Sequence, residues 1–494
     1  MSSAEAAPVS SRHARINPHN PPKHGEVDDP ENWGEYDQIW PHLGPSRAAE
    51  CEEDETRQLL IERVRYLWRR GQLDEALEFG SQLAGTWALQ YHPDDMQTLY
   101  LRIQNANVLR SQGRYSEALT EDTAVHARQR EVLGDVHLHT LFTAGGIAAD
   151  LRGLGEFQQA LEMDQERYDR FKDNYGEDYR ATLSAANNLA IDLRLIGDYR
   201  RARDLDAETL SRRKEVLGDQ PYTFHSAAML ARDLREAGDY VGSLELLREA
   251  YENYVGNVGE DDLGTLLTAQ SLAVSLRKVG RLEEAYQLTL DTGERYEKRK
   301  VGEHPEALIC QVNLAAAQAA LGDRAGAYTT AGAVHRSYEG SLGKNHPFTL
   351  AVASNMAGYL RAVGDVREAL LRAESTGRSL RANLGDDHPY SLSCALTMAN
   401  CLHDLGQFSA AEELQRETID RLRRAFGDSH PDTLTAQANL AITLRALGQG
   451  AEADRLQRHL LATMTRPPLA ENHPLTLALR SWVLVDGEVE PQPT

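Results

Sequence analysis

The chain has 494 residues, of which 41% are hydrophobic and 26% charged, ordinary values for a soluble globular protein. Its formal net charge of −22 argues against nucleic acid as a partner, because the phosphates would be repelled. No apolar run reaches membrane-spanning length and no apolar leader opens the chain, so we expect a cytoplasmic protein with no membrane partner.

The N-terminal region divides into two segments. Residues 1–28 are rich in Ser, Ala, Pro, His and Asn and are predicted to be disordered. Residues 29–52 are predicted to form a short amphipathic helix, because Trp33, Tyr36 and Trp40 recur at helical spacing. Aromatic side chains of this size need burial, so we expect the helix to cap the segment that follows. The alternative is a detached helix that docks on a partner domain.

From residue 53 to residue 466 one pattern repeats every 42 residues, with a single interval of 41. Leucine stands four residues before a central glycine in all copies but one. Alanine recurs seven residues before that glycine and five residues after it. The leucine and the alanine before the glycine share one face of a helix, and the glycine ends that helix. The alanine after the glycine lets the second helix approach the first closely. Each copy is therefore a helical hairpin that must stack on its neighbours. The ten glycines are Gly71, Gly113, Gly155, Gly197, Gly238, Gly280, Gly322, Gly364, Gly406 and Gly448.

A His-Pro pair accompanies the later repeats, with the histidines at His304, His346, His388, His430 and His473. Histidine is predicted to cap the inter-repeat turn, and proline to occupy the first position of the next helix. A shared metal ion is excluded, because helices in contact lie about 8–10 Å apart and metal ligands must converge within a few ångströms. Residues 467–485 are predicted to form a C-terminal capping helix, and residues 486–494 a flexible tail.

The NLA…L…G…A pattern resembles the tetratricopeptide repeat, and its 42-residue length and LG-D-x-HP-x-TL linker are similar to the kinesin-light-chain variant. The resemblance covers about four-fifths of the chain. It implies an all-α, right-handed superhelix of about ten hairpins plus capping helices. The segment before the array also resembles the junction that precedes such arrays in bacterial NB-ARC (STAND) ATPases, although no GxxxxGK[ST] motif is present.

Two polar columns follow the repeat. Arginine stands three residues before the glycine at Arg110, Arg152, Arg194, Arg235, Arg277, Arg361 and Arg445. Asparagine stands nine residues before it at Asn188, Asn313, Asn355 and Asn439. The resemblance implies that both columns face a concave groove. Asparagine can bond a peptide backbone at both donor and acceptor, and arginine can hold a carboxylate by two parallel bonds.

An alternative reading of the arginine column is a ladder of solvated ion pairs. Four of the arginines have an acidic residue four positions later, at Glu156, Asp198, Asp239 and Asp365. Such exposed pairs contribute only about 0.2–1 kcal/mol. Arg110, Arg277 and Arg445 lack this partner and are the stronger candidates for ligand contact.

The predicted function is a non-enzymatic scaffold whose groove holds an extended segment that is acidic or ends in a carboxylate. No nucleophile, metal or phosphate-loop motif supports catalysis, so we expect no cofactor and no catalytic residue. The alternative is a sensor or assembly module of a bacterial STAND-type signalling system that recognises a whole protein. A neighbouring gene for a partner ATPase would favour that alternative. A neighbouring gene for a small peptide precursor would favour the scaffold. The sensor domain of a transcription regulator is disfavoured, because no basic helix-turn-helix segment appears at either end.

Overall fold

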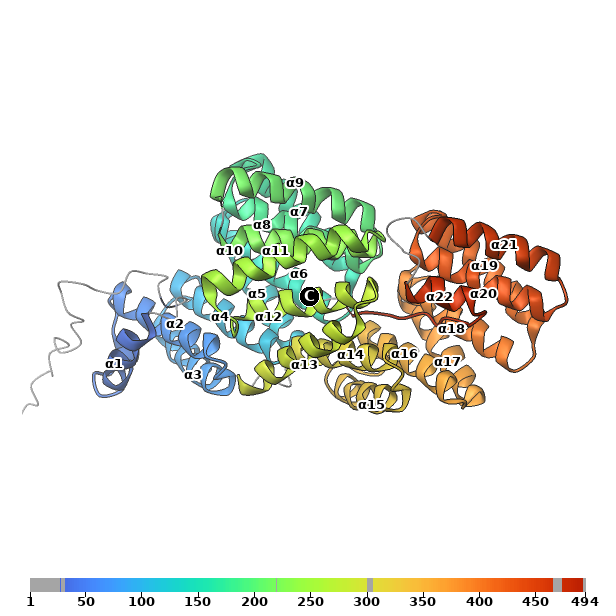
Figure 1. Cartoon of the computed structure of the whole chain (residues 1–494). Helices are drawn as coiled ribbons and strands as arrows, with labels where there is room; N and C mark the ends of the chain where they lie inside the picture. Colours follow the sequence, from blue (N-terminus) through green and yellow to red (C-terminus); the bar gives the residue numbers. More distant parts are fainter. Residues whose placement is uncertain (1–26, 28–31, 219, 300–304, 465–472, 492–494) are drawn as a thin grey trace, which may run out of the picture. The chain divides into compact units, whose positions relative to one another are not determined.

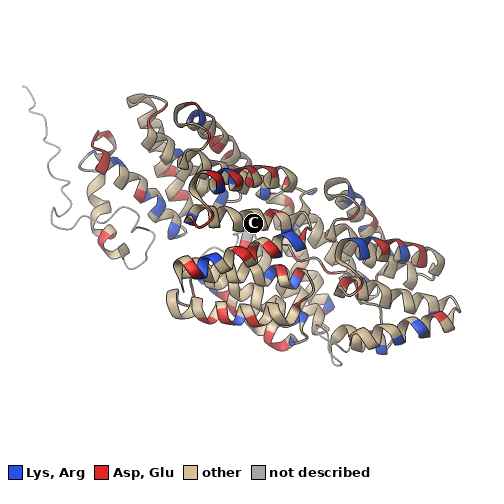
Figure 2. Cartoon of the chain, turned by 90° about the horizontal axis from the view of Figure 1, so that it is seen from above, with Lys and Arg blue, Asp and Glu red and all other residues tan. Residues whose placement is uncertain are grey.

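The structure is a computed structural model of the whole chain, and it describes residues 27, 32–218, 220–299, 305–464 and 473–491. Two compact units are present, Met1–Gly153 and Leu154–Thr494. In both, the described elements are helices without any strand (Figure 1). Acidic and basic residues are interspersed along these helices (Figure 2).

The first unit contains a capping helix, two complete hairpins and one further helix. These elements are α1 (Trp33–Leu43), the short 3-10 turn η3 (Ala48–Glu50), α2 (Asp54–Arg69), α3 (Leu73–Gln90), α4 (Met96–Ser111), α5 (Tyr115–Leu133) and α6 (Leu138–Gly153). The aromatic residues of α1 are packed against α2, where the rings of Trp40 and Tyr66 meet edge to face with centroids 5.3 Å apart. Helix α1 therefore packs against the first repeat.

The second unit contains one leading helix, seven complete hairpins and a short last helix. They are α7 (Phe157–Tyr175), α8 (Arg180–Leu195), α9 (Tyr199–Leu217), α10 (Pro221–Glu236), α11 (Tyr240–Val258), α12 (Leu263–Lys278), α13 (Leu282–Lys298), α14 (Pro305–Ala320), α15 (Arg324–Ser341), α16 (Pro347–Val363), α17 (Val366–Leu384), α18 (Pro389–Asp404), α19 (Phe408–Phe426), α20 (Pro431–Ala446), α21 (Gly450–Met464) and α22 (Pro474–Arg480). The boundary between the units falls inside the third predicted repeat. Nine of the ten predicted helix pairs lie within a unit, and the two helices of the third pair, α6 and α7, belong to different units.

The repeat columns have the expected local roles. The central glycine ends the first helix in a left-handed conformation, as at Gly364, where φ is 97° and the amide donates to the carbonyls of Leu360 and Arg361. The alanine five residues later is buried in every repeat that carries it. In the one repeat with serine there, Ser243 is also buried and shares a 2.8 Å hydrogen bond with Ser275 of the adjacent hairpin. Small side chains at this position let the two helices of a hairpin approach closely.

The His-Pro pairs cap helices as predicted and also make a contact that the sequence did not suggest. In α16, α18, α20 and α22 the histidine is the N-cap and accepts a backbone N–H two residues on through Nδ1. Nε2 of His388, His430 and His473 lies 2.9, 2.8 and 2.7 Å from a carbonyl oxygen 193–195 residues earlier, at the end of α8, α10 and α12. We call these three the inter-turn contacts. His304 lies outside the described residues.

The inter-turn contacts define the histidine tautomer and a second requirement for glycine. A backbone N–H can only donate and a carbonyl can only accept, so Nδ1 is unprotonated and Nε2 carries the proton. The proline of each pair packs over a repeat glycine of the earlier turn. A Cβ on Gly197 would lie 2.6 Å from Cδ of Pro389. Glycine is therefore required at this position for two reasons: it ends the helix with a positive φ, and it leaves room for the proline of the later turn.

The C-terminal end differs from the sequence prediction. Residues 467–472 and 492–494 lie outside the described part of the chain, as do residues 1–26. The last helix was predicted to run to residue 485, but α22 ends at Arg480. Residues 486–491, predicted to be flexible, have a defined position against the repeats, described below. An extended segment of this length has no internal hydrogen bonds, so only its tertiary contacts can fix its position.

Two further features of the described residues concern helix hydrophobicity and thiols. Within the described ranges, no helix combines the length and apolar character that crossing a bilayer requires. All four cysteines are free thiols; Cys310, Cys394 and Cys401 are buried, and Cys51 is partly buried.

Candidate functional site

The C-terminal segment lies across the first helices of successive repeats in the second unit. After α22 the chain turns at Trp482, where φ is 56°, and residues 483–491 continue without helical structure. We call residues 483–491 the tail. The surface it contacts, formed by α10, α12, α14, α16, α18 and α20, is called the groove.

Asparagine side chains hold the tail by its backbone. The Asn355 amide accepts from the Val489 N–H at 2.8 Å and donates to the Val489 carbonyl at 2.7 Å. Asn439 does the same at Val485, with distances of 3.0 and 2.8 Å. Asn400 adds a bond of 2.9 Å to the Val485 carbonyl. Each paired contact copies the bonding of a neighbouring β-strand, so it needs an extended ligand but no particular side chain.

The first acidic residue of the tail is held by the arginine of α16. Arg361 donates to both carboxylate oxygens of Asp486, at 2.7 and 2.9 Å. The third guanidinium nitrogen bonds Asp404 at 2.7 Å, and Asn400 donates to Asp486 at 3.1 Å. This is the two-bond grip that arginine and carboxylate geometries favour.

The next two acidic residues meet a cluster of cations from α10 and α12. Arg277 pairs with Glu488 and, at 2.7 Å, with Glu490. Glu490 also lies 3.3 Å from Lys278 and 3.6 Å from Arg235. Burial by itself would raise the pKa of Glu490, but Lys278, Arg235 and Arg277 outweigh it and lower that pKa to about 2. Glu490 is therefore held as a carboxylate at neutral pH.

The tail also fits the groove by shape. A Cβ on Gly487 would lie 2.2 Å from the carbonyl oxygen of Ser393, so the backbone is too close for any other residue. Val489 is 3% exposed and joins the hydrophobic core of α14 to α18. The hydroxyl of Tyr390 donates to the Glu490 carbonyl at 3.2 Å.

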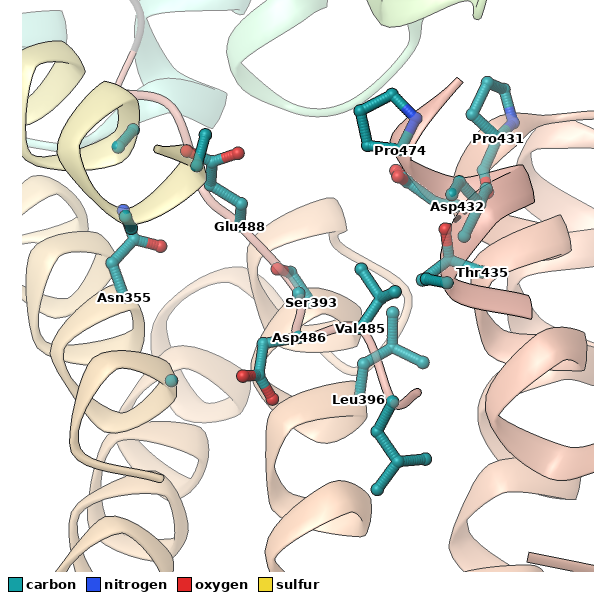
Figure 3. A pocket seen from close by; sticks show the side chains of 18 of the residues that line it. Asn355, Ser393, Leu396, Pro431, Asp432, Thr435, Pro474, Val485, Asp486 and Glu488 are labelled. Atoms are coloured by element: carbon teal, nitrogen blue, oxygen red, sulfur yellow. Dashed lines mark hydrogen bonds between the residues drawn. The ribbon is translucent and has the colours of Figure 1, made fainter. Parts of the chain in front are cut away.

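A cavity remains beside the tail. Its volume is about 410 Å³, and the tail forms one of its walls. Figure 3 shows Asp486 and Glu488 projecting from the tail between Asn355 and the opposite wall, where Pro431 and Pro474 lie. The groove is thus wider than the tail that occupies it.

The predicted arginine column separates into two groups. In the first, arginines form buried ion pairs within the repeats. Arg110 bonds Asp122 and Asp150 at 2.7 and 2.8 Å. Arg194 bonds Asp206 and Asp233 at 3.3 and 2.5 Å, with its side chain fully buried.

Arg152 is likewise buried, and Asn188 is partly buried. The prediction that Arg110 lacks an internal partner was therefore wrong, because the partners stand 12 and 40 residues later rather than four.

The second group faces the tail. It contains Arg235, Arg277 and Arg361, which pair with acidic residues of the tail. Arg445 is exposed, and its guanidinium lies 4.4 Å from the ring centroid of Trp482, the residue before the tail. Arg361 and Arg235 bond residues other than the acidic residue four positions on. The ion-pair ladder with i+4 partners is thus not how these two side chains are used.

Sequence reasoning missed Asn400, Lys278 and Tyr390 as groove residues. Asn400 stands three residues after the column position, which is Thr397 in that repeat, and so remains on the same helix face. Lys278 directly follows Arg277. A search for residues that recur at one offset in ten repeats does not detect a polar residue that occurs in a single repeat at a different offset. Among the residues that the structure describes, no group of three or more His, Cys, Asp or Glu is placed to hold a metal ion.

Comparison with known proteins identifies the repeat. The family model of the tetratricopeptide repeat matches residues 94–173, 179–255 and 391–466. No curated protein matches the chain.

Solved structures with similar folds include three helical-repeat proteins. A kinesin light chain of Podosopora anserina with nearly identical TPR-like repeats is 28% identical; the match covers 40% of this chain and 94% of that one, with a TM-score of 0.33. A Rap protein complexed with competence and sporulation factor is 12% identical. The match covers 72% of this chain and 99% of the Rap protein, with a TM-score of 0.47. The quorum sensor NprR of B. thuringiensis, in its apo form, is 15% identical. The match covers 73% of this chain and 95% of NprR, with a TM-score of 0.46.

Proposed function

We propose that this chain, which carries tetratricopeptide repeats over residues 94–173, 179–255 and 391–466, is a non-enzymatic scaffold whose groove binds an extended acidic segment of another protein. The observation that carries the proposal is the tail. It is an extended acidic segment, and it lies on the asparagine and arginine columns through bonds to Asn355, Asn439, Arg277 and Arg361.

Two kinds of contact support a ligand supplied by another molecule. The asparagine bonds address backbone atoms that every peptide has, whereas the arginine and lysine bonds select for carboxylates. The groove therefore accepts a class of sequences and discriminates by charge. A segment ending in a free carboxylate offers the same group to Arg277 and Lys278. The extended conformation of the tail favours a peptide over the recognition of a whole folded partner.

The tail is also a competitor for such a ligand. It belongs to the same chain, so its effective concentration at the groove is far above that of a free peptide, on the order of millimolar for short flexible connections. A partner has to displace it. The affinity of the unmodified protein for a peptide in solution is therefore lower than that of the groove itself.

The test uses the full-length protein with its tail neutralised by Asp486→Asn, Glu488→Gln and Glu490→Gln, called the neutral-tail variant. A fluorescein-labelled peptide of residues 481–494 is titrated and followed by anisotropy. We expect it to bind the neutral-tail variant more tightly than the unmodified protein, and more weakly as salt rises. An amidated copy of the peptide measures what the terminal carboxylate contributes.

Groove and control substitutions are then compared in the neutral-tail background. Arg277→Gln with Arg361→Gln should lower the affinity at least about tenfold, because each removes a charge-assisted pair. Arg458→Gln is the matched control, since Arg458 is exposed on α21 and bonds its own helix. If the peptide fails to bind, or if a peptide with lysine at the three acidic positions binds equally well, the proposal is overturned.

A further inference from the structure

The two paired asparagine contacts fix a register between tail and repeats. Asn439 holds Val485 and Asn355 holds Val489, so two repeats correspond to four tail residues. The tail therefore advances two residues per repeat and runs from the later repeats toward the earlier ones. Gly487 is the residue that corresponds to the intermediate repeat, where the column carries Thr397 instead of asparagine.

The next position in this register pairs an asparagine with a proline. Asn313 is the column residue one repeat before Asn355, and Pro491 stands two residues after Val489. Asn313 and Pro491 line the same small pocket with Arg235 and Glu490. Proline has no N–H, so Oδ1 of Asn313 cannot receive the bond that Asn355 and Asn439 receive. Across the described ranges, no hydrogen bond of the Asn313 side chain is found, and the residue is 6% exposed.

We propose that the preferred ligand carries Asp-Gly-Glu-x-Glu, in which x is apolar because Val489 is buried at that position, followed by a residue other than proline, which Asn313 clamps. We also propose that Pro491 makes the protein's own tail a weaker competitor. This inference rests on the proposed function and specifies its ligand. The acidic residues and the glycine of this pattern are required for different reasons. The acidic residues pair with Arg361, Arg277 and Lys278, whereas the glycine is required because the backbone lies so close to Ser393.

The same geometry explains how a partner displaces a tethered segment. A ligand with an N–H in the Pro491 position gains one hydrogen bond to a buried side chain that the tail leaves unused. A hydrogen bond of this kind changes a binding constant by about three- to tenfold. That gain offsets part of the advantage that tethering gives to the tail.

The experiment is a double-mutant cycle between peptide and protein. Peptides of residues 481–494, unmodified or with Pro491→Ala, are titrated into the neutral-tail variant with and without Asn313→Ala. We expect Pro491→Ala to bind about three- to tenfold more tightly where Asn313 is present, and to lose this gain where it is replaced. A Pro493→Ala peptide controls for the general effect of removing a proline, and its change should not depend on Asn313. Circular dichroism checks that the Asn313→Ala protein remains folded.

A measurement within one chain gives an independent check. Pro491→Ala in the otherwise unmodified protein should strengthen the hold on its own tail, so the unmodified peptide should bind it about three- to tenfold more weakly. If both peptides bind the neutral-tail variant with equal affinity, the register is wrong while the proposed function stands. If neither peptide binds, the proposed function fails and the inference fails with it.

Discussion

The histidine of the inter-turn contact at α18 should make the second unit sensitive to acid. His388 is 6% exposed, and both ring nitrogens are used: Nδ1 accepts the Tyr390 N–H at 3.1 Å, and Nε2 donates to the Leu195 carbonyl at 2.9 Å. A second proton would place an N–H at Nδ1 against that backbone N–H. The folded structure therefore holds the neutral ring. The perturbation to test is a fall in pH from 7.5 to 5.0, in the unmodified protein and in His388→Asn.

The magnitude follows from the shift in pKa. Burial lowers the pKa of His388 from 6.5 to about 4, a change that the bond to Leu195 only partly opposes. A depressed pKa means that the unfolded chain binds the proton first, so the contribution of His388 to stability is complete above pH 6.5 and is lost as pH falls toward 4. From pH 6.5 to pH 5.0 the loss is about 2 kcal/mol, at about 1.36 kcal/mol per pH unit.

The assay is urea unfolding followed by far-UV circular dichroism at both pH values. The difference in unfolding free energy between the unmodified protein and His388→Asn should shrink by about 2 kcal/mol at pH 5.0. His459→Asn is the matched control, because His459 is exposed on α21, and its difference should not change with pH. An equal pH dependence in the unmodified protein and His388→Asn would refute the argument.

Four further outcomes can be measured on purified variants. Gly385→Ala should cost about 1–3 kcal/mol of stability in thermal melts, because its φ of 90° and ψ of 167° suit essentially glycine alone. Gly197→Ala should cost more, because it also has a positive φ and its Cβ would meet a proline ring of the later turn. Arg194→Met should cost about 3–5 kcal/mol in urea unfolding, because it leaves two buried aspartates without their cation. Gly487→Ala in the labelled peptide should reduce binding at least about tenfold in the anisotropy assay, since the blocking atom is a backbone oxygen. His473→Asn in the neutral-tail variant should weaken peptide binding, although His473 itself is not expected to contact the peptide. His473 bonds the carbonyl of Lys278, and the Lys278 side chain pairs with the position of Glu490. Unchanged binding would contradict this argument.

The repeat and its hairpins could be read from the sequence, because the columns that form them recur at a fixed interval. Leucine, alanine and glycine each act within one hairpin or between adjacent hairpins, so their spacing carries the information. The inter-turn contacts could not be read in this way. His388 and Leu195 lie 193 residues apart, and the pairing depends on how far each stacked hairpin rotates, which no single repeat reveals.

The arginine column shows why a position alone does not give a role. Arg110 and Arg194 have aspartates on the next helix and in the next repeat, 12 and 39 or 40 residues later, and these bury the charge. Arg277 and Arg361 have no aspartate at those offsets, and they hold the tail instead. A sequence search for partners across adjacent helices, rather than within one helix, would have separated the two groups.

The acidic tail was visible in the sequence, and so were the arginine and asparagine columns that we predicted to line the groove. The two could not be joined from sequence alone. The alternation Val-Asp-Gly-Glu-Val-Glu places carboxylates and valines on opposite faces only if the segment is extended. Nothing within so short a segment dictates that conformation, because its backbone bonds are completed by Asn355 and Asn439.

The inter-turn contacts and the groove use the same helix ends, which links the stability of the unit to the contacts that hold the tail. The carbonyl of Lys278 receives His473, while its ammonium group pairs with Glu490. The carbonyl of Glu236 accepts a hydrogen bond from Nε2 of His430. The neighbouring residue, Arg235, lies 3.6 Å from the carboxylate of Glu490. Joining one turn to the next therefore fixes the positions of the cations that hold the carboxylate of Glu490. A solenoid open along its length would present the same side chains at variable spacing and would lose the two-residue register that the asparagines impose on an extended peptide.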